Sequence, residues 1–586
     1  MASISFLINM NLYAAQSLPI CGSFSSLFPP FQKTRQRSKS KRHHALRVAC
    51  SGDTNRRDIL IGLGGLYGAT SLSSNLSALG LPLSPPDPTN CVTSTVVTPE
   101  NGTFKIECCP PPPFTDYVIP ASNNTQFRIR KAAHLVDDEY IAKYKEAIRR
   151  MKALPDDDPR SFKQQAAVHC AYCAGGYKQK GFPDKDIDVH ESWLFAPFHR
   201  WYLYFFERIL GSLIGDPTFA LPYWNWDHPN GMRMPSIFTT DTTSPLYDPL
   251  RDSRHLAAFM DLNFNFDKED KPHVNPTIKE INDNLATLHR EFLLKTDQTD
   301  FFGAPYHAGA NPNTSYGSLE TVHNTIHMWT GVNPVTNPKS NGENMGILYS
   351  AARDPIFYCH HSNVDRIWNI WTTQLPGGPR SNFSDPDYLE TSYFFYDENK
   401  NYVRVKVKDC LDSTRLGYDY QRADLPWLNA GGLIKRKSLS RVAPKQVFKV
   451  TKILPTLQFP LIVDSILRTT VNRPKVGANP LEREVLVIDV EYDKGQRVRF
   501  DVFINDEDDD DIGPQDAEFG GSFVTLPHHA NQTKVSSSSF RIPLNNLLQA
   551  LDATNDESIT VTLCPKYGKV PVTIKGIKIE RVPLLK

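Results

Sequence analysis

The amino-acid sequence predicts two folded parts, a mainly helical domain with long loops and, after it, an all-β sandwich-like domain. At 586 residues the chain is too long for one ordinary hydrophobic core. Residues from about 130 to 380 carry helical apolar patterns and most of the aromatic side chains. After about residue 440 the apolar residues alternate with period two, as in strands with one buried face. We therefore expect the helical domain at 81–428, an exposed linker at 429–446 and the sandwich at 447–586.

The first 80 residues have the composition of targeting signals. The first 50 contain no Asp or Glu, many serines and seven Lys or Arg from Lys33 to Arg47, which is typical of a transit peptide. Arg56 and Arg57 then precede a short apolar stretch, as in twin-arginine export signals. Gly and Ser interrupt that stretch too often for a membrane span, so no stable membrane insertion is expected. Residues 1–80 therefore predict import into the chloroplast and then into the thylakoid lumen.

The helical domain contains two segments with a clear helical pattern. "APFHRWYLYFFERILGSLIG" (196–215) is apolar nearly all round, which predicts a buried helix. "DRIWNIW" (365–371) spaces its Ile and Trp residues as a helix does. Long loops with Pro, Asn and Gly lie between them, so we expect a helical bundle with extended connections.

The C-terminal part contains four segments with strand alternation, at 484–492, 498–505, 558–563 and 572–582. They predict an antiparallel sandwich. The acidic run 506–511 is expected to be a solvated loop. The basic segment "IKRKSLSRVAPK" (434–445) has few bulky apolar residues, which favours an exposed linker that proteases can cut.

The overall composition suits a soluble globular protein, with 40% hydrophobic and 22% charged residues. The formal net charge of +1 gives no indication of a nucleic-acid partner. "VHCAYCAGGY" (168–177) places a histidine beside two cysteines, but no second CxxC pair exists to complete a zinc ribbon.

Six of the seventeen histidines stand out by their context. In "HNTIH" the two histidines are spaced i and i+4, on one face of a helix, and Asn324 occupies the place of the Glu in the HExxH zinc-protease pattern. Three neutral imidazoles without a thiolate or carboxylate suit copper or zinc. Two ions side by side are therefore expected, one at His169, His190 and His199, the other at His323, His327 and either His360 or His361.

Two long stretches carry a resemblance to a known family. "HESWLFAPFHRWYLYFFE" (190–207) and "DPIFYCHHSNVDRIW" (354–368) resemble the two copper-binding signatures of type-3 copper proteins, specifically plant polyphenol oxidases. The resemblance covers nearly the whole chain, including "LGYDYQRADLPWL" (416–428) and "RFDVFINDEDD" (499–509). It implies a four-helix bundle around a dicopper site. It also selects His361 as the sixth ligand, because the family pattern has a ligand four residues before Asp365.

The resemblance also implies covalent bonds of the cysteines. In this family the second cysteine of "HCAYC" bonds through sulfur to the imidazole of the second copper ligand, which corresponds to Cys173 and His190. The first cysteine of that motif belongs to a disulfide in relatives. The pairs implied here are Cys108–Cys170 and Cys91–Cys109, which would tie the extended N-terminal segment to the bundle.

Four further residues correspond to positions that modulate substrate choice in the family. Glu320 resembles an acid that holds a water near the coppers, although it lies three residues before the ligand where many relatives have four. Asn324 follows the first ligand of the second copper and is associated in relatives with monophenol deprotonation. Met328 is expected to line the entrance. Leu348 stands where many relatives carry a Phe gate, which predicts easier access.

The implied activity is oxidation of ortho-diphenols to ortho-quinones with dioxygen as co-substrate, and in some relatives also hydroxylation of monophenols. Two alternatives are an oxygen carrier like the haemocyanins and an oxidase for one pigment precursor such as a chalcone. Plastid targeting and the thioether motif argue against a carrier. The C-terminal domain has no histidine pattern for a metal, and in relatives it covers the copper entrance. We therefore expect a latent precursor that is activated when this domain is removed or displaced.

Overall fold

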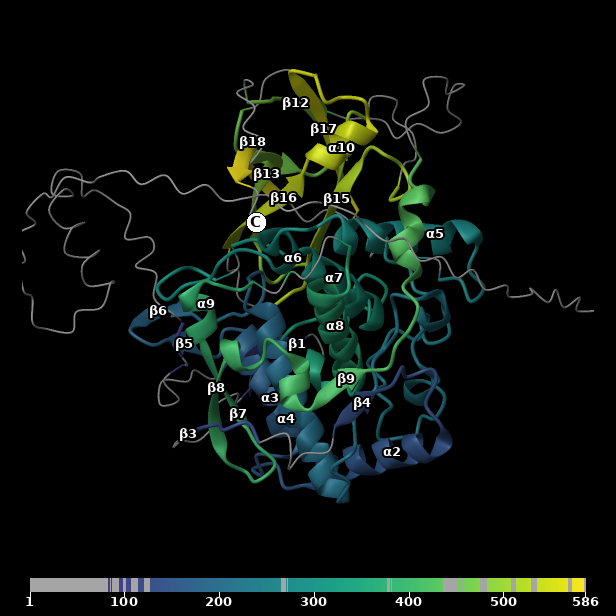
Figure 1. Ribbon diagram of the computed structural model, residues 1–586, viewed down its shortest axis with the longest axis vertical. Helices are drawn as coiled ribbons and strands as arrows, with labels where there is room; N and C mark the ends of the chain where they lie inside the picture. Colours follow the sequence, from purple (N-terminus) through teal and green to yellow (C-terminus); the bar gives the residue numbers. More distant parts are fainter. Residues whose placement is uncertain are drawn as a thin grey trace, which may run out of the picture. The chain divides into compact units, whose positions relative to one another are not determined.

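The chain divides into two units, Met1–Asn75 and Leu76–Lys586. The computed structural model describes only residues of the second unit (Figure 1). The targeting signals predicted at 1–80 therefore lie outside the described residues. The described residues are 83–84, 86, 94–98, 102–106, 114–120, 127–264, 270, 272–312, 314–376, 380, 382–435, 452–454, 458–474, 482–506, 513–528, 535–566 and 572–583.

The N-terminal part of this unit is mainly helical. Its helices are α2 (Asp138–Ala153), α3 (Phe162–Cys173), α4 (Phe195–Ile214), α5 (Ile278–Leu288), α6 (Gln298–Phe302), α7 (Ser318–Thr330), α8 (Ile356–Thr373) and α9 (Pro386–Glu390). Short helices of other types are η3 (Pro229–Gly231), η4 (Ser236–Phe238), η5 (His289–Leu293), η6 (Ala351–Arg353), η7 (Val407–Asp409), η8 (Ser413–Leu416) and η9 (Pro426–Leu433).

Local sequence signals explain where several of these helices begin and end. The side chains of Asp137 and Ser161 accept hydrogen bonds from backbone N–H groups in the first turns of α2 and α3. Thr277 and Glu280 form a capping box at the start of α5. At the end of α4, Gly215 adopts a left-handed conformation with φ of 69°, which a residue without a Cβ reaches at little cost.

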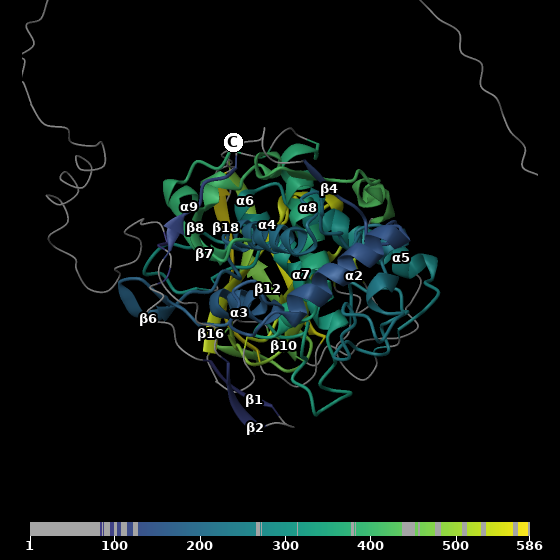
Figure 2. The ribbon, with the colours of Figure 1, turned by 90° about the horizontal axis from the view of Figure 1, so that it is seen from below.

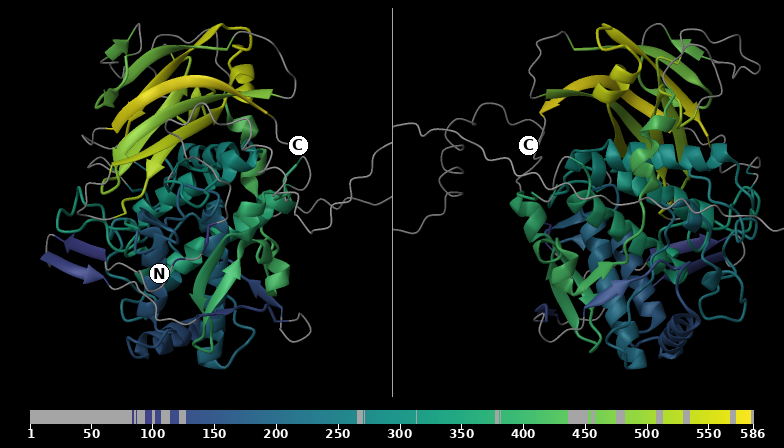
Figure 3. Two further views of the ribbon diagram at one scale, coloured as in Figure 1. Left: turned by 90° about the vertical axis from the view of Figure 1, so that its left-hand side faces the viewer. Right: turned by 45° about the vertical axis from the view of Figure 1, so that its right-hand side comes forward.

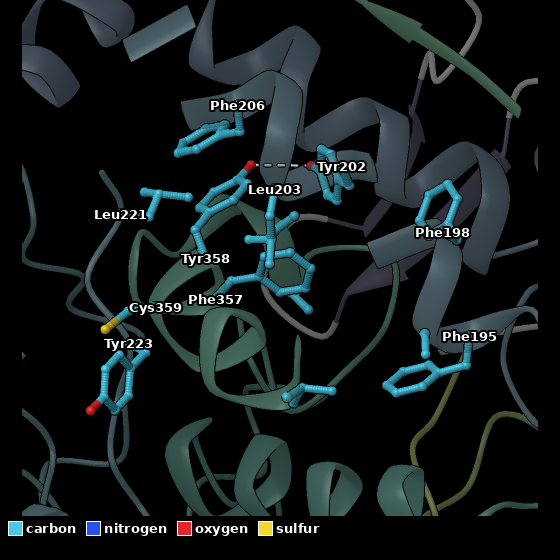
Figure 4. Packing of buried hydrophobic residues seen from close by; sticks show 14 of the residues in the cluster. Phe195, Phe198, Tyr202, Leu203, Phe206, Leu221, Tyr223, Phe357, Tyr358 and Cys359 are labelled. Atoms are coloured by element: carbon cyan, nitrogen blue, oxygen red, sulfur yellow. Dashed lines mark hydrogen bonds between the residues drawn. The ribbon is translucent and has the colours of Figure 1, made fainter. Parts of the chain in front are cut away.

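Helices α3, α4, α7 and α8 form the centre of the helical part (Figure 2). Helix α8 packs against both α4 and α7. Figure 4 shows part of the aromatic packing between α4 and α8. The rings of Phe206 and Tyr358 stack with centroids 3.4 Å apart, and the hydroxyls of Tyr202 and Tyr358 are 3.1 Å apart. Every residue of α7 is buried, so polar side chains on this helix need partners inside the protein.

Short strands tie distant segments to the bundle. They are β1 (Ser94–Thr98), β2 (Gly102–Ile106), β3 (Thr115–Asp116), β4 (Arg128–Arg130), β5 (Lys178–Gln179), β6 (Phe182–Asp186), β7 (Ser392–Tyr396), β8 (Tyr402–Lys406) and β9 (Tyr418–Tyr420). Strand β4 pairs in parallel with β9, and β7 pairs antiparallel with β8. The first of these pairings brings the end of the helical part back onto its beginning.

The C-terminal part consists of two sheets. Their strands are β10 (Lys452–Leu454), β11 (Leu461–Val463), β12 (Leu467–Asn472), β13 (Glu482–Asp493), β14 (Val498–Ile504), β15 (Phe519–Thr525), β16 (Val535–Pro543), β17 (Ser558–Pro565) and β18 (Val572–Pro583), with helix α10 (Asn545–Ala550) after β16. One sheet has the order β10-β12-β17-β14-β15 and the other β11-β18-β13-β16. All described pairings in both are antiparallel except β10 with β12. Side chains of both sheets share one hydrophobic cluster, so the predicted sandwich is confirmed.

The sandwich strands gather on one side of the helices (Figures 1 and 3). Strand β16 alternates between buried and more exposed residues, as the period-two pattern predicts. Strand β14 is buried at every position. Its neighbour β15 contacts α7, and Arg499 on β14 donates to the carbonyl oxygen of Phe264, so this side of the sandwich faces the helical part. The four predicted strand segments correspond to β13, β14, β17 and β18. The predicted fold class, a mainly helical part followed by an antiparallel β part, is confirmed.

The end of the helical part lies close to the predicted linker. Helix η9 extends to Leu433, beyond the predicted linker start at 429, and Ala430 within it is buried. Lys435 forms an isolated bridge with Asp516 of the C-terminal part. Residues 436–451 are outside the described residues, so the rest of the predicted linker stays a prediction. Among the described residues, no helix combines the length and hydrophobicity needed to span a membrane.

Candidate metal centre

Two groups of buried histidines lie next to each other in the helical bundle. His169 is on α3, His190 follows β6 and His199 is on α4. His323 and His327 are one turn apart on α7, as their spacing predicts, and the pair His360–His361 is on α8. Potential ligand atoms within each group all lie within 4.8 Å of one another: His169, Cys173, His190 and His199 in one, and His323, His327, His360 and His361 in the other.

The first group forms a nearly equilateral triangle of imidazoles. The ring centroids of His169, His190 and His199 are separated by 5.6, 5.6 and 5.4 Å. The Nε2 atoms of His169 and His199 are buried and have no hydrogen-bond partner. A buried imidazole nitrogen without a partner is unfavourable, and coordination of a metal ion removes this cost.

The second group converges on one point. The Nε2 atom of His361 lies 3.1 Å from Nε2 of His323 and 3.2 Å from Nε2 of His327. Two nitrogens that bind one ion tetrahedrally at 2.0–2.1 Å are about 3.3 Å apart. The two groups adjoin, because the rings of His199 and His361 stack with centroids 4.1 Å apart. The geometry thus suits two neighbouring ions.

The adjacent histidines on α8 differ in their surroundings. The ring of His360 stacks on that of His323 and lies near Trp224 and Trp226. Both of its ring nitrogens are buried without a hydrogen-bond partner, so burial alone does not distinguish it from His361. It is the Nε2 atom of His361 that lies close to the Nε2 atoms of His323 and His327. His361 is also the residue that the family pattern selects.

The Nδ1 atoms of four rings are held by acceptors. Nδ1 of His169 lies 3.0 Å from the carbonyl oxygen of Leu348, and Nδ1 of His327 lies 2.7 Å from that of Met345. Nδ1 of His199 donates to the backbone within α4, and Nδ1 of His323 donates to Oδ1 of Asn324. When Nδ1 carries the proton, Nε2 presents a lone pair. The residues present therefore fit a metal bound through Nε2.

The same histidines are neutral at physiological pH. Burial lowers the pKa of His327 to about 3, and burial followed by the charges of neighbouring imidazoles holds the pKa of His169 well below its usual value. The pKa values of His199, His323 and His361 are lowered for the same two reasons. Neutral imidazoles are the form that binds a metal ion.

The cysteines of the "HCAYC" motif lie at the end of α3. Cys173 is fully buried, and its Sγ belongs to the first group, within 4.8 Å of a His190 nitrogen. That proximity is compatible with the expected thioether, which stays a prediction. Cys170 is disulfide-bonded, and Cys91, Cys108 and Cys109 lie outside the described residues. The expected pairings therefore stay predictions as well.

Glu320 lies at the start of α7, but its carboxylate has a backbone partner. Both of its oxygens accept from the N–H of Glu191, at 3.0 and 2.8 Å. Glu191 follows His190 and has a φ of 54°, a left-handed conformation that is uncommon for a residue with a side chain. Burial, followed by the charge of Glu191, raises the pKa of Glu320 well above its usual value. Glu320 thus supports the backbone next to His190.

The other three substrate-control candidates also have defined places. Asn324 donates from Nδ2 to the carbonyl oxygen of Val524 on β15, at 2.9 Å. Met328 is fully buried in the hydrophobic cluster of the helical part. The side chain of Leu348 is buried, its carbonyl holds His169, and its N–H donates to the carbonyl oxygen of Pro527. The main chain of Leu348 therefore links His169 to the C-terminal part.

Several functional groups near the site are absent from the sequence-based predictions. Asp188 lies beside His190, with Oδ1 3.5 Å from its Nδ1, and accepts from Nε2 of His528 at 2.7 Å. The hydroxyl of Tyr492 donates to Glu191 at 2.5 Å. The "DVH" spacing of Asp188 and His190 was a usable signal, whereas the C-terminal partners come from more than 300 positions away and have none.

Family models match three consecutive parts of the chain. Residues 159–374 match the common central domain of tyrosinase, residues 382–431 the polyphenol oxidase middle domain, and residues 459–581 the chloroplastic polyphenol oxidase C-terminal domain. The first of these contains every histidine of the two buried groups.

Individual relatives match over most of the chain. A chloroplastic polyphenol oxidase of Malus domestica is 46% identical over 573 residues, which covers 93% of this chain and 94% of the relative. Aureusidin synthase of Antirrhinum majus is 46% identical over 537 residues, covering 88% and 92%. The solved structure of latent apple tyrosinase has a TM-score of 0.72 and 46% identity and covers 80% of this chain and all of the other.

The histidine clusters and these likenesses lead to one conclusion. A latent aurone synthase structure, also described as a polyphenol oxidase, superposes with a TM-score of 0.76 at 41% identity, covering 86% of this chain. The structure of an active aurone synthase is described with a copper B site. With its two adjacent imidazole clusters placed for a pair of copper ions, the chain belongs to the plant polyphenol oxidases of the tyrosinase family.

Proposed function

We propose that this centre, loaded with two copper ions, oxidises ortho-diphenols to ortho-quinones with dioxygen as co-substrate. We assign one ion to His169, His190 and His199 and the other to His323, His327 and His361. The observation that carries the proposal is the pair of adjoining imidazole clusters in which Nδ1 atoms are anchored and Nε2 atoms face inwards.

The surrounding residues hold the rings and limit access of water. When bound, the copper pair supplies dioxygen binding and takes up two electrons from each diphenol, so that two diphenols and one O₂ give two quinones and two waters. The ring of Phe357 packs 4.2 Å from that of His361 and 4.8 Å from that of His169. The ring of Phe195 packs 4.7 Å from that of His199. These apolar side chains exclude water and hold the imidazoles in place.

The two histidines on α8 allow a matched test of the ligand set. Purified chain should contain two coppers, and the oxidised form should lack an ordinary cupric EPR signal. His361→Gln should remove one ligand, lower the copper content and abolish diphenol turnover. His360→Gln should keep two coppers. A single bound zinc, or two coppers in His361→Gln, would refute the assignment.

We also propose that the C-terminal domain covers this centre. Val524 and Leu526 belong to the hydrophobic cluster of the helical part rather than to the core of the sandwich. The carbonyl oxygens of Val524 and Pro527 accept from Asn324 on α7 and from Leu348. This segment, 524–527, therefore lies against residues that hold the proposed ligands. Latent forms are named among the relatives, which supports a covered precursor.

Monophenol hydroxylation is a second candidate activity. It is supported by the position of Asn324, which contacts His323 and so lies beside a proposed ligand. In the covered form its amide donates to Val524, so a role towards a monophenol requires that the cover moves first. Glu320 does not support this activity in the covered form, since its carboxylate is bound to the backbone. Asn324→Gly should lower turnover of tyramine more than that of catechol in the uncovered enzyme.

The preferred phenol and the compartment are parts of the same proposal. The aureusidin synthase likeness supports a chalcone-type pigment precursor as an alternative substrate, and oxygen uptake on tyramine, catechol and a chalcone discriminates between these substrates. An oxygen carrier would bind dioxygen without consuming it in the same assay. Relatives are named chloroplastic, and the twin-arginine segment supports a final location in the thylakoid lumen, which an import assay on isolated chloroplasts tests.

A further inference from the structure

The C-terminal domain contacts groups that hold the proposed copper ligands, and the clearest case is His323. Its Nδ1 donates to Oδ1 of Asn324, whose Nδ2 donates to the carbonyl oxygen of Val524 on β15. The side-chain amide of Asn324 is thus hydrogen-bonded both to the proposed ligand His323 and to the C-terminal domain. The orientation of its amide, and with it the acceptor offered to His323, depends on the C-terminal domain.

A second connection runs through the loop between α7 and α8. The carbonyl oxygens of Met345 and Leu348 accept from Nδ1 of His327 and His169. The loop itself is held by the C-terminal domain, since the N–H of Leu348 donates to Pro527.

Arg497 at the start of the β14 region fastens the same loop. Its Nη2 donates to the carbonyl oxygen of Gly346 at 3.2 Å and to that of Val332 at 3.3 Å. A Cβ atom added at Gly342 or Gly346 would collide with this guanidinium, so the loop and the arginine are closely packed. The two carbonyls that orient His169 and His327 therefore sit in a loop whose position the C-terminal domain sets.

A third connection reaches His190. Asp188 lies with Oδ1 3.5 Å from Nδ1 of His190 and also accepts from its backbone N–H. Oδ2 of the same carboxylate accepts from Nε2 of His528 at 2.7 Å, and the ammonium of Lys494 is 3.8 Å away. By contrast, Nδ1 of His199 donates to the carbonyl oxygen of Phe195 within α4.

We propose that the C-terminal domain completes the outer hydrogen-bond network of the copper centre and makes the intact chain the form that retains copper. The proposal rests on the ligand assignment made above. Groups that hydrogen-bond to ligating histidines fix the tautomer and the ring orientation, and their loss typically weakens metal binding about 10- to 100-fold. Detachment of the domain therefore has two opposite effects, since it opens the site to large phenols and loosens the acceptors behind His169, His190, His323 and His327.

The test measures copper loss from the copper-loaded full-length chain. Arg497→Met removes the donor that holds the α7–α8 loop, and His528→Ala removes the donor to Asp188; both substitutions leave every proposed ligand in place. Each should release copper to an excess of a chelator about 10- to 100-fold faster than the wild type. Arg497→Lys and His528→Gln, which keep a donor, should restore most of the retention.

Arg483→Met is the matched control. Arg483 makes ion pairs with Asp297 and Asp300 across the same two domains but touches none of the groups behind the ligands. This variant should weaken the domain contact and yet release copper within about twofold of the wild-type rate, a difference too small to count as loss of an outer ligand partner. Thermal unfolding of the copper-free variants tests whether the domains remain folded.

Three outcomes overturn the inference. If Arg497→Met and His528→Ala retain copper as the wild type does, the C-terminal contacts do not hold the ligands. If Arg483→Met releases copper as fast as the other two, the effect belongs to the domain contact in general. A wild-type chain that does not hold two coppers would refute the ligand assignment together with the inference, whereas two coppers with unchanged variants would refute the inference alone.

Discussion

At the scale of single residues, buried polar side chains near the site support the backbone. Glu320 is the clearest example, because both of its oxygens accept from the N–H of Glu191, which adopts a left-handed conformation directly after His190. In this covered form its carboxylate serves as a structural acceptor. Hydrogen bonds of this type fix the segment that carries one proposed ligand.

Replacing Glu320 should therefore change stability. Glu320→Ala leaves the buried N–H of Glu191 without an acceptor, which should lower the free energy of unfolding of the copper-free chain by about 1–3 kcal/mol. Glu320→Gln keeps one acceptor oxygen and should lose less. Urea unfolding followed by fluorescence measures both. Loss of turnover in Glu320→Ala with unchanged stability would instead favour the water-holding role.

The thioether is a prediction at the same scale. The intact mass of the reduced, denatured chain should be lower than the sequence mass by two hydrogen atoms, and the peptides that contain Cys173 and His190 should co-elute. Cys173→Ser should still bind copper, because the bond restrains a ligand ring without supplying a ligand atom. Recovery of a free, alkylatable Cys173 after reduction would contradict the bond.

A pH dependence is predicted for Asp248. Its carboxylate is buried, and burial followed by the charge of Asp354 raises its pKa to about 6, from an ordinary value of 3.8. Because the folded state disfavours the ionised form, this group makes the protein less stable as the pH rises from about 4 through 6. Asp248→Asn should remove a penalty of up to about 3 kcal/mol at pH 7, and the gain should shrink as the pH falls to 4. A gain that is constant over this range would contradict the raised pKa.

At the scale of elements, two short parallel strands close the helical part. Strand β9 alternates, so that Tyr418 and Tyr420 point to the same side, and both hydroxyls donate to Asp365 on α8, at 2.6 and 2.5 Å. Arg200 on α4 and Arg130 on β4 also bind this carboxylate. Strand β9, near the end of the helical part, thus holds helix α8, which carries His361, through Asp365.

Asp365→Ala should break this anchor. It removes a carboxylate that Arg200 and Arg130 share. Arg130 keeps Glu207 as a partner, and the uncompensated charge of buried Arg200 should cost about 3–5 kcal/mol of stability. Differential scanning calorimetry of the copper-free chain measures the loss. Tyr420→Phe, which removes only one of the four donors, should cost much less. Equal losses in the two variants would show that the carboxylate does not connect the elements.

At the scale of the whole molecule, the C-terminal domain contacts the helical part in two places. The segment 524–527 lies against α7 and Leu348, and Arg290 donates to the carbonyl oxygens of Pro514, Asp516 and Phe519. These contacts join the two domains at residues outside the linker, so cutting the linker does not by itself separate the domains.

Cleavage followed by separation should raise activity on large substrates. The cut belongs after Lys435, since Trp427 is fully buried and donates to Asp227 from within η9. The isolated helical part should oxidise a bulky diphenol faster than the nicked, unseparated chain, while catechol should respond less because a small ring needs less space. Equal turnover of the bulky diphenol before and after separation would refute the cover.

Most local features of this protein were predictable from its sequence. The helical periods of 196–215 and 365–371 and the i, i+4 histidines of α7 are present where predicted, because short-range geometry fixes which residues share a helix face. The period-two segments form β13, β14, β17 and β18 for the same reason. The resemblance of the histidine stretches to copper signatures extended these local patterns to the family, which the comparisons confirm.

Only the tertiary structure decided which partner each site residue takes. Glu320 binds the backbone of Glu191, and Asn324 binds Val524, 200 positions away. His528, which belongs to no predicted metal pattern, binds Asp188, 340 positions earlier. The sequence by itself determines the ligand types and their periodicity, since both are local. Which buried donor meets which acceptor depends on how the sandwich packs on the bundle, and no short-range pattern encodes that arrangement.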